Sequence, residues 1–497
     1  MSEVIDSNVR TPLFFAAVDN SQANTAQEVQ RTLLIGQMLN GTAAVNEPVP
    51  CGSPQMAIEL AGQGSMLAAM TSAYMGNDTG GNVYLLPLTE PTGTAATGTL
   101  AISDVATENG VLALYIAGTP VNLTVVSADT VGTIGTDLAT MINQRADLPV
   151  TAVSTVASGT ATVTLTAKQK GEVGNTLDLR LNYLGSAGGE RTPAGMVVVL
   201  TAMSGGAGIP DLTDALANLK DKAFDFIVLP YSDTTSLDAV KVLLNDKSGR
   251  WSYSKQTYGH AFSTVTGTYG QLTAVGEGRN DQHASLLGVY NSPSPAYLWS
   301  AGYTGAIAGS LRADPGRPVQ TLPVYGVLAP PMVSRFDQPE RNNLLHSGIA
   351  SYTVADDGTV QIENIITTYQ KNAYGAADDS YLEVETLFLL TYTLRRLRTL
   401  ITSRFGRMKL VDDGTRFAPG LPIVTPATIK GALIADYGQM ETQGYVQDSK
   451  GFAKGLIVTK SRANPNRVDV LWDGVLVNQL RIVALLNQFR LQSDSAA

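Results

Sequence analysis

The side chains that most often do chemistry in proteins are scarce in this chain, and they are not spaced as catalysis or metal binding requires. Its three histidines, His260, His283 and His346, never occur at the i and i+4 spacing that lets two helical residues share a metal ion. Each is more often a hydrogen-bonded structural residue than a lone general base. The single cysteine, Cys51, has no histidine near it in sequence, which favours a small buried residue over a nucleophile and excludes a disulfide within the chain.

Motifs for phosphate binding and covalent catalysis are missing too. The sequence contains no Gly-Lys dipeptide and therefore no P-loop, and it has no G-x-S-x-G, H-E-x-x-H or EF-hand pattern. The glycine-rich stretches 204–208 and 276–278 could present backbone N–H groups to a phosphate. Neither follows a strand in a complete dinucleotide fingerprint, so both are better interpreted as turns.

Two pairs of adjacent carboxylates are the remaining candidates for acid–base catalysis. Asp378 and Asp379 fit the start of a helix, where acidic side chains complement the helix dipole. Asp412 and Asp413 lie in turn-rich sequence, where neighbouring acids are usually solvated loop residues. The sequence therefore predicts no catalytic residue, no metal site and no cofactor.

Composition restricts the class of protein further. The chain has 497 residues, of which 44% are hydrophobic and 15% charged, so it can bury a large core and is not disordered throughout. With 34 basic and 43 acidic residues it carries a net charge of −9, which argues against a dedicated nucleic-acid binder. No apolar run reaches the length of about 18 residues that a membrane span needs, and the amino terminus lacks the features of a signal peptide. We expect a protein that folds in a cytoplasm.

The hydrophobic pattern predicts a chain organised around an inserted domain. Residues 1–30 are typical of an extended arm, and a strand at 31–36, a helix at about 54–75 and a buried strand at 83–88 follow. Between residues 92 and 204 the sequence is rich in Thr, Ala, Val and Gly. This block predicts one helix near 130–145 among strands at 97–102, 111–117, 119–126, 150–156, 160–167, 176–183 and 196–203. We expect an inserted β-rich domain whose two ends lie close together.

After the insertion, helices and strands alternate as they do in a parallel sheet covered by helices. The dipeptide Asp357-Gly358 predicts a hairpin turn, and the clearest helix covers 381–405, where apolar residues recur at spacings of 3 and 4. The other elements predicted here are strands at 224–230, 258–265, 286–290, 466–472 and about 476–490, and helices at 211–221, 236–246 and 295–311.

Together these elements predict a multidomain fold of the α+β or α/β class. We expect a discontinuous core of mixed sheet and flanking helices that carries the inserted β-rich domain, with extended arms at both ends. The predicted segments are an amino-terminal arm (1–30), a core in two parts (31–91 and 205–380), the insertion (92–204), a carboxyl-terminal domain (381–465) and a carboxyl-terminal arm (466–497).

One local charge pattern contrasts with the acidic whole. Residues 386–411 contain no acidic side chain and six basic ones, Arg395, Arg396, Arg398, Arg404, Arg407 and Lys409. The simplest interpretation is a solvated helix face whose charges complement the helix dipole. The alternative is a surface that docks on an acidic partner. A nucleic-acid surface is the weaker alternative, because no aromatic residues are interleaved with the arginines.

The two ends of the chain also allow two interpretations. An extended arm at the start and β-prone strands at the end suit the addition of strands to the sheet of another chain, but both could pair within their own subunit. Residues 1–25 are the candidate segment at the amino end. The candidate residues at the carboxyl end are Val468, Val470, Trp472, Val475 and Val477.

A series of segments carries a family resemblance in collinear order over nearly the whole chain. The segments are Arg31–Gln37, Gly64–Met70, Val83–Leu88, Thr166–Gly171, Phe224–Tyr231, Ser292–Pro295, Gln320–Val324, Gly326–Pro331, Ile366–Gln370, Asp412–Phe417, Asp469–Leu471 and Val477–Arg481. The chain closely resembles the tail sheath proteins of Mu-like contractile-tailed bacteriophages. No single segment is a chemical motif, and the resemblance is specific because of their number and order.

The resemblance implies a structural subunit without enzymatic activity. Such subunits stack as helical rings, hexameric in this family, around a tail tube in an extended metastable state. They contract on baseplate triggering and drive the tube through the host envelope for genome delivery. The resemblance places the protein in the virion tail sheath, assembled in the host bacterial cytoplasm. Its implied partners are other copies of itself, the tail tube protein, and baseplate and tail terminator proteins, with no direct nucleic acid and no membrane insertion.

The resemblance also assigns roles to parts of the chain. It implies that both arms exchange strands between subunits, that the insertion faces outward, and that the carboxyl-terminal domain, with its basic residues, lies near the tube. Two other classes stay open from the residues alone. A hydrolase with a β-rich accessory domain would need a pocket with convergent polar groups, and a cell-surface binding module is disfavoured by the missing signal peptide.

Overall fold

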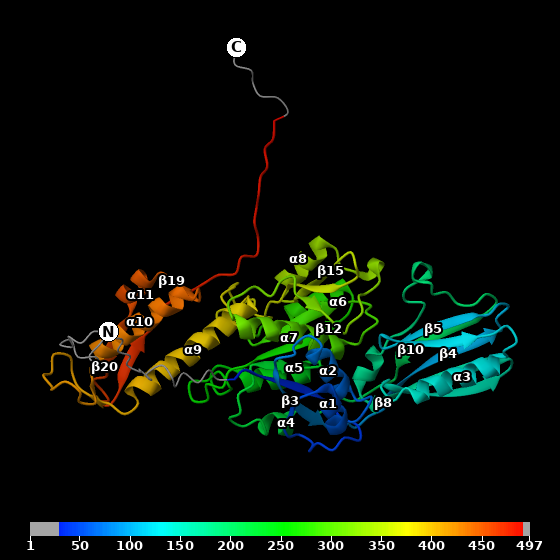
Figure 1. The fold of residues 1–497 in the computed structure, drawn as a ribbon, viewed down its shortest axis with the longest axis horizontal. Helices are drawn as coiled ribbons and strands as arrows, with labels where there is room; N and C mark the ends of the chain where they lie inside the picture. Colours follow the sequence, from blue (N-terminus) through cyan, green and yellow to red (C-terminus); the bar gives the residue numbers. More distant parts are fainter. Residues whose placement is uncertain (1–28, 491–497) are drawn as a thin grey trace, which may run out of the picture. The chain divides into compact units, whose positions relative to one another are not determined.

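A computed structural model of the chain describes residues 29–490, which Figure 1 draws as a ribbon. The described residues form two compact units. The main unit takes residues 30–388 and 478–490, and the second unit takes residues 29 and 389–477. No helix in the described range is long and apolar enough to cross a membrane.

The main unit is built on a six-stranded sheet that is parallel except at one edge. Its strands are buried along most of their length, as a sheet covered on both faces requires. Pairing of Thr32 with Phe226 and of Leu33 with Tyr84 places β1 between strands from before and after the insertion. Only β2 runs antiparallel in this sheet. In spatial order the strands are β13 (Ala284–Val289), β12 (His260–Thr266), β11 (Phe226–Val228), β1 (Arg31–Gln37), β3 (Asn82–Leu88) and β2 (Val49–Cys51).

Helices flank this sheet, and several begin at a side-chain cap. Ser53, Ser65 and Asp233 each accept a hydrogen bond from a backbone N–H of the first turn. The single helix predicted at 54–75 is wrong, because Gly62 and Gly64 adopt φ angles of 90° and 77° and divide the run into two helices. Outside the insertion the helices are α1 (Pro54–Ala61), α2 (Met66–Met75), α4 (Thr213–Ala217), α5 (Thr234–Leu244), α6 (Tyr269–Glu277), α7 (Ala296–Ala313) and α8 (Gln338–His346).

A buried chain of polar contacts joins β1, α2 and α7. The Tyr74 hydroxyl donates to Asp78 Oδ2 at 2.6 Å and lies 2.6 Å from Thr32 Oγ1. Arg312 makes a bidentate pair with Asp78 at 2.8 and 2.9 Å. Burial raises the pKa of the Asp78 carboxyl, but the hydrogen bonds from Arg312 and Tyr74 outweigh this effect and hold the pKa below its ordinary value. Asp78 is therefore charged at neutral pH and links α2 to α7.

The inserted β-rich region begins and ends at the same place on the main unit. Thr94 forms a β-bridge with Ala207, and a Cβ added to Gly93 would lie 1.9 Å from the Ala207 carbonyl oxygen, so only glycine permits this approach. The strands form two sheets, ordered β10-β4-β8-β7 and β6-β5-β9, and α3 packs on β7 and β8. The elements follow the predicted order, but the strand predicted at 176–183 is reduced to three residues. They are β4 (Ala95–Asp104), β5 (Gly110–Ile116), β6 (Thr119–Val125), α3 (Val131–Gln144), β7 (Val150–Ala157), β8 (Thr160–Lys170), β9 (Leu179–Leu181) and β10 (Val197–Ser204). That 92–204 is a separate domain stays a prediction.

A small three-stranded sheet completes the main unit. The predicted hairpin turn is present, with Gly358 at a φ of 87° and the Asp357 side chain accepting a hydrogen bond from Thr359 N. The sheet has the order β14-β16-β15, with β14 (Pro323–Val324), β15 (Ser351–Val354) and β16 (Val360–Asn364). The prediction of a mixed fold of helices and sheets is confirmed in this unit.

The second unit has its own core, centred on α10. The rings of Tyr437 and Phe452 stack with centroids 3.8 Å apart, and Leu397 and Ile401 of α9 pack against this cluster. The sequence pattern predicts α9 but not α10. The buried stripe of α10 (Ile429, Leu433, Tyr437 and Met440) has little contrast with its other faces, which carry Ala427, Ile434 and Ala435. The elements are α9 (Val384–Phe405), which begins in the main unit, α10 (Pro426–Thr442), α11 (Ser449–Gly455), β17 (Lys409–Leu410), β18 (Ile423–Val424), β19 (Val446–Gln447), β20 (Ile457–Lys460), β21 (Val468–Leu471) and β22 (Val475–Leu476).

Arg312→Met tests the buried ion pair of the main unit. Removing the guanidinium leaves the Asp78 carboxylate buried without its cation, so we expect the free energy of unfolding to fall by about 3 kcal/mol at pH 7. The pKa of Asp78 is lowered in the folded state, so its stabilisation is present above the unfolded pKa of about 4 and is lost as the pH falls through the folded value. Denaturant unfolding at several pH values measures this. If the free energy of unfolding of the variant stays below that of the wild type by the same amount under pH 4, the ion pair between Arg312 and Asp78 is not the source of the difference.

Candidate functional site

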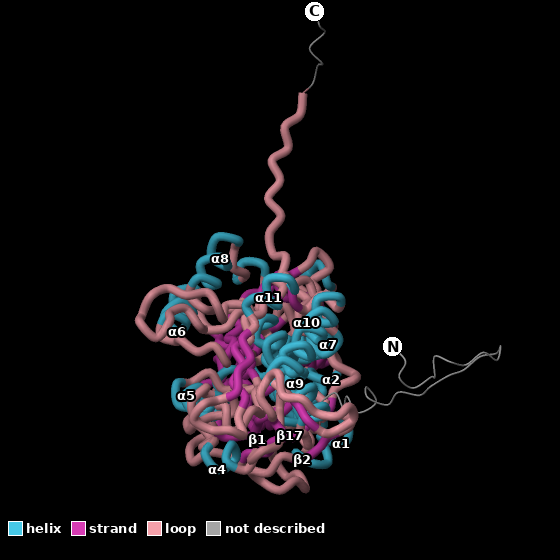
Figure 2. The backbone as a smooth tube through the Cα atoms, turned by 90° about the vertical axis from the view of Figure 1, so that its left-hand side faces the viewer, coloured by secondary structure: helices cyan, strands magenta, loops and turns pink. Residues whose placement is uncertain are grey.

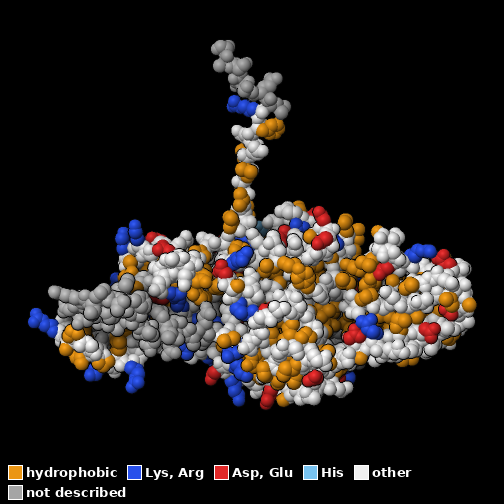
Figure 3. All heavy atoms as spheres, viewed as in Figure 1, with side chains coloured by type: hydrophobic (Ala, Val, Ile, Leu, Met, Phe, Trp, Pro, Cys, Tyr) orange, Lys and Arg blue, Asp and Glu red, His pale blue; other side chains and the backbone are white. Residues whose placement is uncertain are grey.

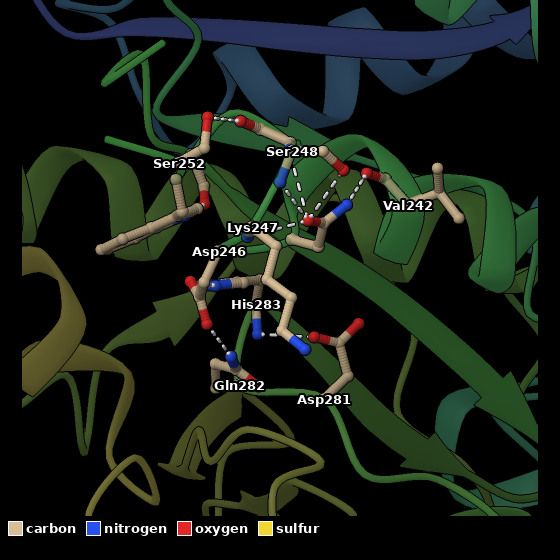
Figure 4. A network of polar contacts seen from close by, with 12 residues as sticks. Val242, Asp246, Lys247, Ser248, Ser252, Asp281, Gln282 and His283 are labelled. Carbon is tan, nitrogen blue, oxygen red and sulfur yellow. Dashed lines mark hydrogen bonds and ion pairs between the residues drawn. The ribbon is translucent and has the colours of Figure 1, made fainter. Parts of the chain in front are cut away.

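His283 lies in a buried polar cluster and not in an open site. In Figure 4 the Asp246 carboxylate points at the His283 ring, with Oδ1 2.8 Å from Nε2, and Gln282 donates to Oδ2 at 2.5 Å. The hydrogen bond from His283 lowers the pKa of Asp246. The ring stacks on Trp251 with 4.5 Å between centroids, and its Nδ1 is buried with no partner. No hydroxyl or thiol nucleophile of the described residues is therefore bonded to this ring.

His260 forms the one arrangement that resembles a nucleophile and its base within the described residues. Its Nε2 lies 2.9 Å from Ser285 Oγ, which is the distance of a Ser–His pair. Both residues lie inside the parallel sheet with exposed fractions of 1% and 0%, and burial holds the pKa of His260 well below its ordinary value. Its Nδ1 has no partner that could orient the ring. The pair is structural, and His346 lies exposed at the end of α8.

The other chemistry candidates also have structural roles. Cys51 is buried, which raises the pKa of its thiol. Asp378 and Asp413 each accept a hydrogen bond from a backbone N–H at 2.9 Å, and Asp412 pairs with Lys460 at 3.1 Å. Within residues 29–490, no group of three His, Cys, Asp or Glu side chains could hold a metal ion.

The six basic residues between 386 and 411 do not share one environment. Arg396 lies against α10, where its Nε donates to Asp436 Oδ1 at 2.9 Å and its Nη atoms donate to Gln439 and Gln443. The Arg396 side chain is 19% exposed, and Arg395 is also partly buried. The exposed members, which we call the exposed basic group, are Arg398, Arg404, Arg407 and Lys409.

The exposed basic group belongs to a unit whose charge is opposite to that of the chain. Residues 389–477 hold 13 basic and seven acidic side chains, although the whole chain has a net charge of −9. Some of these acids are engaged within the unit, since Asp436 pairs with Arg396 and Asp448 caps α11. The second unit is therefore a local concentration of positive charge in an acidic protein.

The five candidate residues for strand exchange have partners within their own chain. β21 pairs with β20 and β22 pairs with β19, and Val477 N donates to Tyr445 O at 3.2 Å. The residues concerned are Val468, Val470, Trp472, Val475 and Val477, of which Trp472 packs on the Tyr437 and Phe452 rings. The expected start of a free arm at 466 is corrected, because the chain takes part in the second unit until residue 477. The role of these five residues between subunits stays a prediction.

The next residues, 478–490, have no strand partner within the described chain. The strand predicted at about 476–490 is absent beyond Leu476, and Figure 2 draws this segment as loop. A strand needs a second strand for its backbone hydrogen bonds, and local β propensity cannot supply one. Apolar side chains line the segment in Figure 3, with exposed fractions between 67% and 85% for Leu480, Ile482, Val483, Leu485, Leu486 and Phe489. We call residues 482–490 the exposed arm. The predicted amino-terminal arm falls on residues 1–28, outside the described residues.

Comparison with known proteins identifies the family to which these surfaces belong. The model of the phage tail sheath protein central domain matches residues 205–368, and that of the phage tail sheath C-terminal domain matches residues 376–490. The Mu-like prophage FluMu tail sheath protein of Haemophilus influenzae is 40% identical over 491 residues, which cover 98% of this chain and 99% of that protein. The chain belongs to the phage tail sheath family. The resemblance inferred from the sequence is confirmed, and the family is one of structural virion components.

Solved structures of sheath proteins align with the chain at low sequence identity. A sheath tail protein of Desulfitobacterium hafniense is 13% identical with a TM-score of 0.46, over 94% of this chain and 100% of that one. A sheath tail protein of Listeria innocua is 13% identical with a TM-score of 0.48, over 92% and 94%. The contracted sheath complex of an extracellular contractile injection system is 10% identical with a TM-score of 0.49, over 99% and 100%.

Sequence reasoning missed the ion-pair partners of this tail sheath protein. The sequence allows some arginines of this stretch to pair with acids inside the subunit, but it does not identify Asp436, 40 residues further along the chain, as the partner of Arg396. Arg481 was not singled out, although it pairs with Glu383 and Glu385. No local pattern marks an ion pair between residues so far apart in sequence.

Arg396→Ala and Arg398→Ala distinguish the inward arginine from an exposed one. The first substitution leaves Asp436, whose side chain is 9% exposed, without its cation, so we expect α10 to lose about 2–3 kcal/mol of stability. The second removes an exposed side chain and should change stability by no more than about 0.5 kcal/mol. Hydrogen exchange of the α10 amides, followed by mass spectrometry, compares the two. If the α10 amides are equally protected from exchange in both variants, Arg396 makes no net contribution to the stability of α10.

Proposed function

We propose that this chain polymerises as stacked helical rings around a tail tube, in an extended metastable state, and contracts when a baseplate triggers it. Contraction drives the tube through the host cell envelope for genome delivery. The observation that carries the proposal is the exposed apolar arm on a folded subunit of the tail sheath family. The subunit assembles in the host bacterial cytoplasm into hexameric rings, and its partners are further copies of itself, the tail tube, and baseplate and tail terminator proteins. The energy comes from larger buried contacts in the contracted lattice.

The exposed arm links neighbouring subunits by adding a strand to one of their sheets. Residues 482–489 belong to no strand of the described chain, and the apolar side chains of this segment are exposed to water. The second unit contains the two-stranded sheets β20–β21 and β19–β22, in which each strand has one free edge within the described chain. Such edges accept a further strand readily. The second unit of a neighbouring copy is therefore the proposed acceptor.

The exposed basic group contacts an acidic tube surface in the extended state. Charges of this kind steer association and select register more than they add affinity, and salt weakens them. A contact of this strength suits a surface that must be released during contraction. The arm and the exposed basic group thus have different tasks, one between subunits and one between subunit and tube.

Replacing Leu485, Leu486 and Phe489 by serine tests the role of the arm. We expect a subunit with unchanged thermal stability, because these side chains are exposed, and no helical tubes in electron micrographs of the purified protein. The matched control replaces Val153 and Val156, exposed apolar residues of β7, by serine and should polymerise normally. Deletion of residues 1–20 should likewise leave a folded monomer that assembles poorly. Normal contractile sheaths from the triple-serine variant would exclude the arm from assembly.

Charge reversal of Arg398, Arg404 and Arg407 to glutamate tests the tube contact. We expect the variant to fold. At low salt it should assemble on isolated tubes less well than the wild type, and at high salt, where the charges are screened, the two proteins should assemble to more similar extents. A control variant carries the same charge change at Lys220, Lys247 and Lys255, exposed residues of the main unit. Unchanged assembly and salt dependence would leave the helix-dipole explanation of these charges.

A further inference from the structure

Arg481 is held at the point where the exposed arm leaves the main unit. Its Nη2 lies 2.6 Å from Glu383 Oε2 and 2.8 Å from both carboxylate oxygens of Glu385. Its Nη1 lies 3.4 Å from Gln320 Oε1. The Arg481 side chain is 15% exposed and that of Glu385 is 0% exposed. All four residues belong to the main unit, and we call their contacts the Arg481 clamp.

The backbone beside Arg481 is held as well, and the contacts end abruptly. Gln320 donates to the Leu480 carbonyl at 3.4 Å, and Thr386 donates to the Gln479 side chain at 3.5 Å. Ile482, the next residue along the chain, is 83% exposed. The boundary between the held chain and the exposed chain therefore falls directly after Arg481.

The burial of Glu385 makes the clamp hard to open. Burial raises the pKa of Glu385, and the attraction of Arg481 acts in the opposite direction. Val319 N also donates to this carboxylate at 2.8 Å. Among the described residues, Arg481 is the cation that pairs with Glu385. Withdrawing Arg481 would leave a carboxylate without water or counter-ion, which is strongly unfavourable.

The clamp also joins the two connections between the main unit and the second unit. The chain leaves the main unit after Phe388, close to Glu385 in sequence, and returns at Asn478, close to Arg481. One cluster of charges on the main unit thus holds the outgoing and the returning chain. The start of the arm is set by the main unit and does not depend on residues 389–477.

The arm itself carries little information about strand register. In a strand, neighbouring side chains point to opposite faces, and a pattern that alternates between apolar and polar residues selects one register. In the exposed arm, Ile482 is followed by Val483, and Leu485 by Leu486, so both faces would be apolar. A strand of this kind can slip by one residue at little cost, and its register must be determined elsewhere.

We propose that Arg481 is the positioning residue of the exposed arm, and that the Arg481 clamp determines the register in which residues 482–490 pair with the sheet of a neighbouring copy. This inference rests on the proposed exchange of the arm between subunits. A short arm with a fixed start reaches its acceptor at a higher effective concentration than a longer arm whose start is free. Slipped registers would require Arg481 to leave Glu385, which the buried charge opposes.

Arg481→Gln and Glu385→Gln, with the double variant, test the clamp. In the monomer, we expect hydrogen exchange to show lost protection at residues 479–481 in each variant, with the arm equally unprotected in all proteins. Each single variant should raise the critical concentration for polymerisation by about tenfold and broaden the distribution of helical parameters in electron micrographs. The double variant should be no worse than Arg481→Gln, because it removes the fully buried Glu385 charge and leaves only Glu383, whose side chain is 20% exposed, without its cation. Arg191→Gln, at an exposed arginine of the inserted region, is the control and should behave as wild type.

The comparison with the triple-serine arm variant separates the two proposals. If the arm variant fails to polymerise while the Arg481 and Glu385 variants form regular sheaths at the wild-type concentration, the clamp has no positioning role and the exchange of the arm stands. If the arm variant also polymerises normally, the exchange itself is wrong and the clamp proposal is overturned with it. Where Arg481→Gln does not fold, the double variant, in which the fully buried Glu385 charge is also removed, decides between these outcomes.

Discussion

The position of β1 between β3 and β11 is the constraint on which the main unit depends. β1 precedes the inserted region and β11 follows it, and their parallel pairing begins beside a hydrogen bond from Asp225 N to Arg31 O at 2.8 Å. β3, the last strand before the inserted region, and β11, the first strand after it, both pair with β1, so the chain leaves and re-enters the main unit beside neighbouring strands. The bridge between Thr94 and Ala207, and the glycine at position 93, are the local consequences of this requirement.

The same arrangement recurs where the second unit joins the main unit. Residues 389–477 leave through α9 and return at residue 478, and the buried Glu385 and Arg481 hold the two chain segments on the main unit. In the insertion the closure is made by backbone contacts, whereas here it is made by charge. A buried ion pair contributes little net stability compared with apolar packing, but it permits only one arrangement of its partners. That property suits the place from which an arm must start in a defined direction.

The sequence was most informative where side-chain pattern alone determines structure. Runs such as Leu33-Leu34-Ile35 predict buried parallel strands, and His260 and Cys51 are the hydrogen-bonded histidine and the buried cysteine that the sequence favours. Prediction failed where the outcome depends on a distant partner. The β-prone residues after 476 have no second strand in the described part of the chain. Arg396 pairs with Asp436 of α10, whose buried stripe is obscured in the sequence by apolar residues on its other faces. The family resemblance supplied the function, which no residue chemistry in the chain could have supplied.

The two proposed contact surfaces differ in chemistry as their tasks require. Burying one large apolar side chain contributes about 1.5–3 kcal/mol, so the six exposed apolar residues between Leu480 and Phe489 offer a large gain on docking, even after the cost of ordering the arm. An exposed ion pair contributes only about 0.2–1 kcal/mol and is screened by salt, so the four members of the exposed basic group bind weakly. In a sheath that must rearrange without losing its subunits, the contact between subunits has to persist while the contact with the tube is released. The apolar arm suits the contact that persists, and the exposed basic group suits the contact that is released.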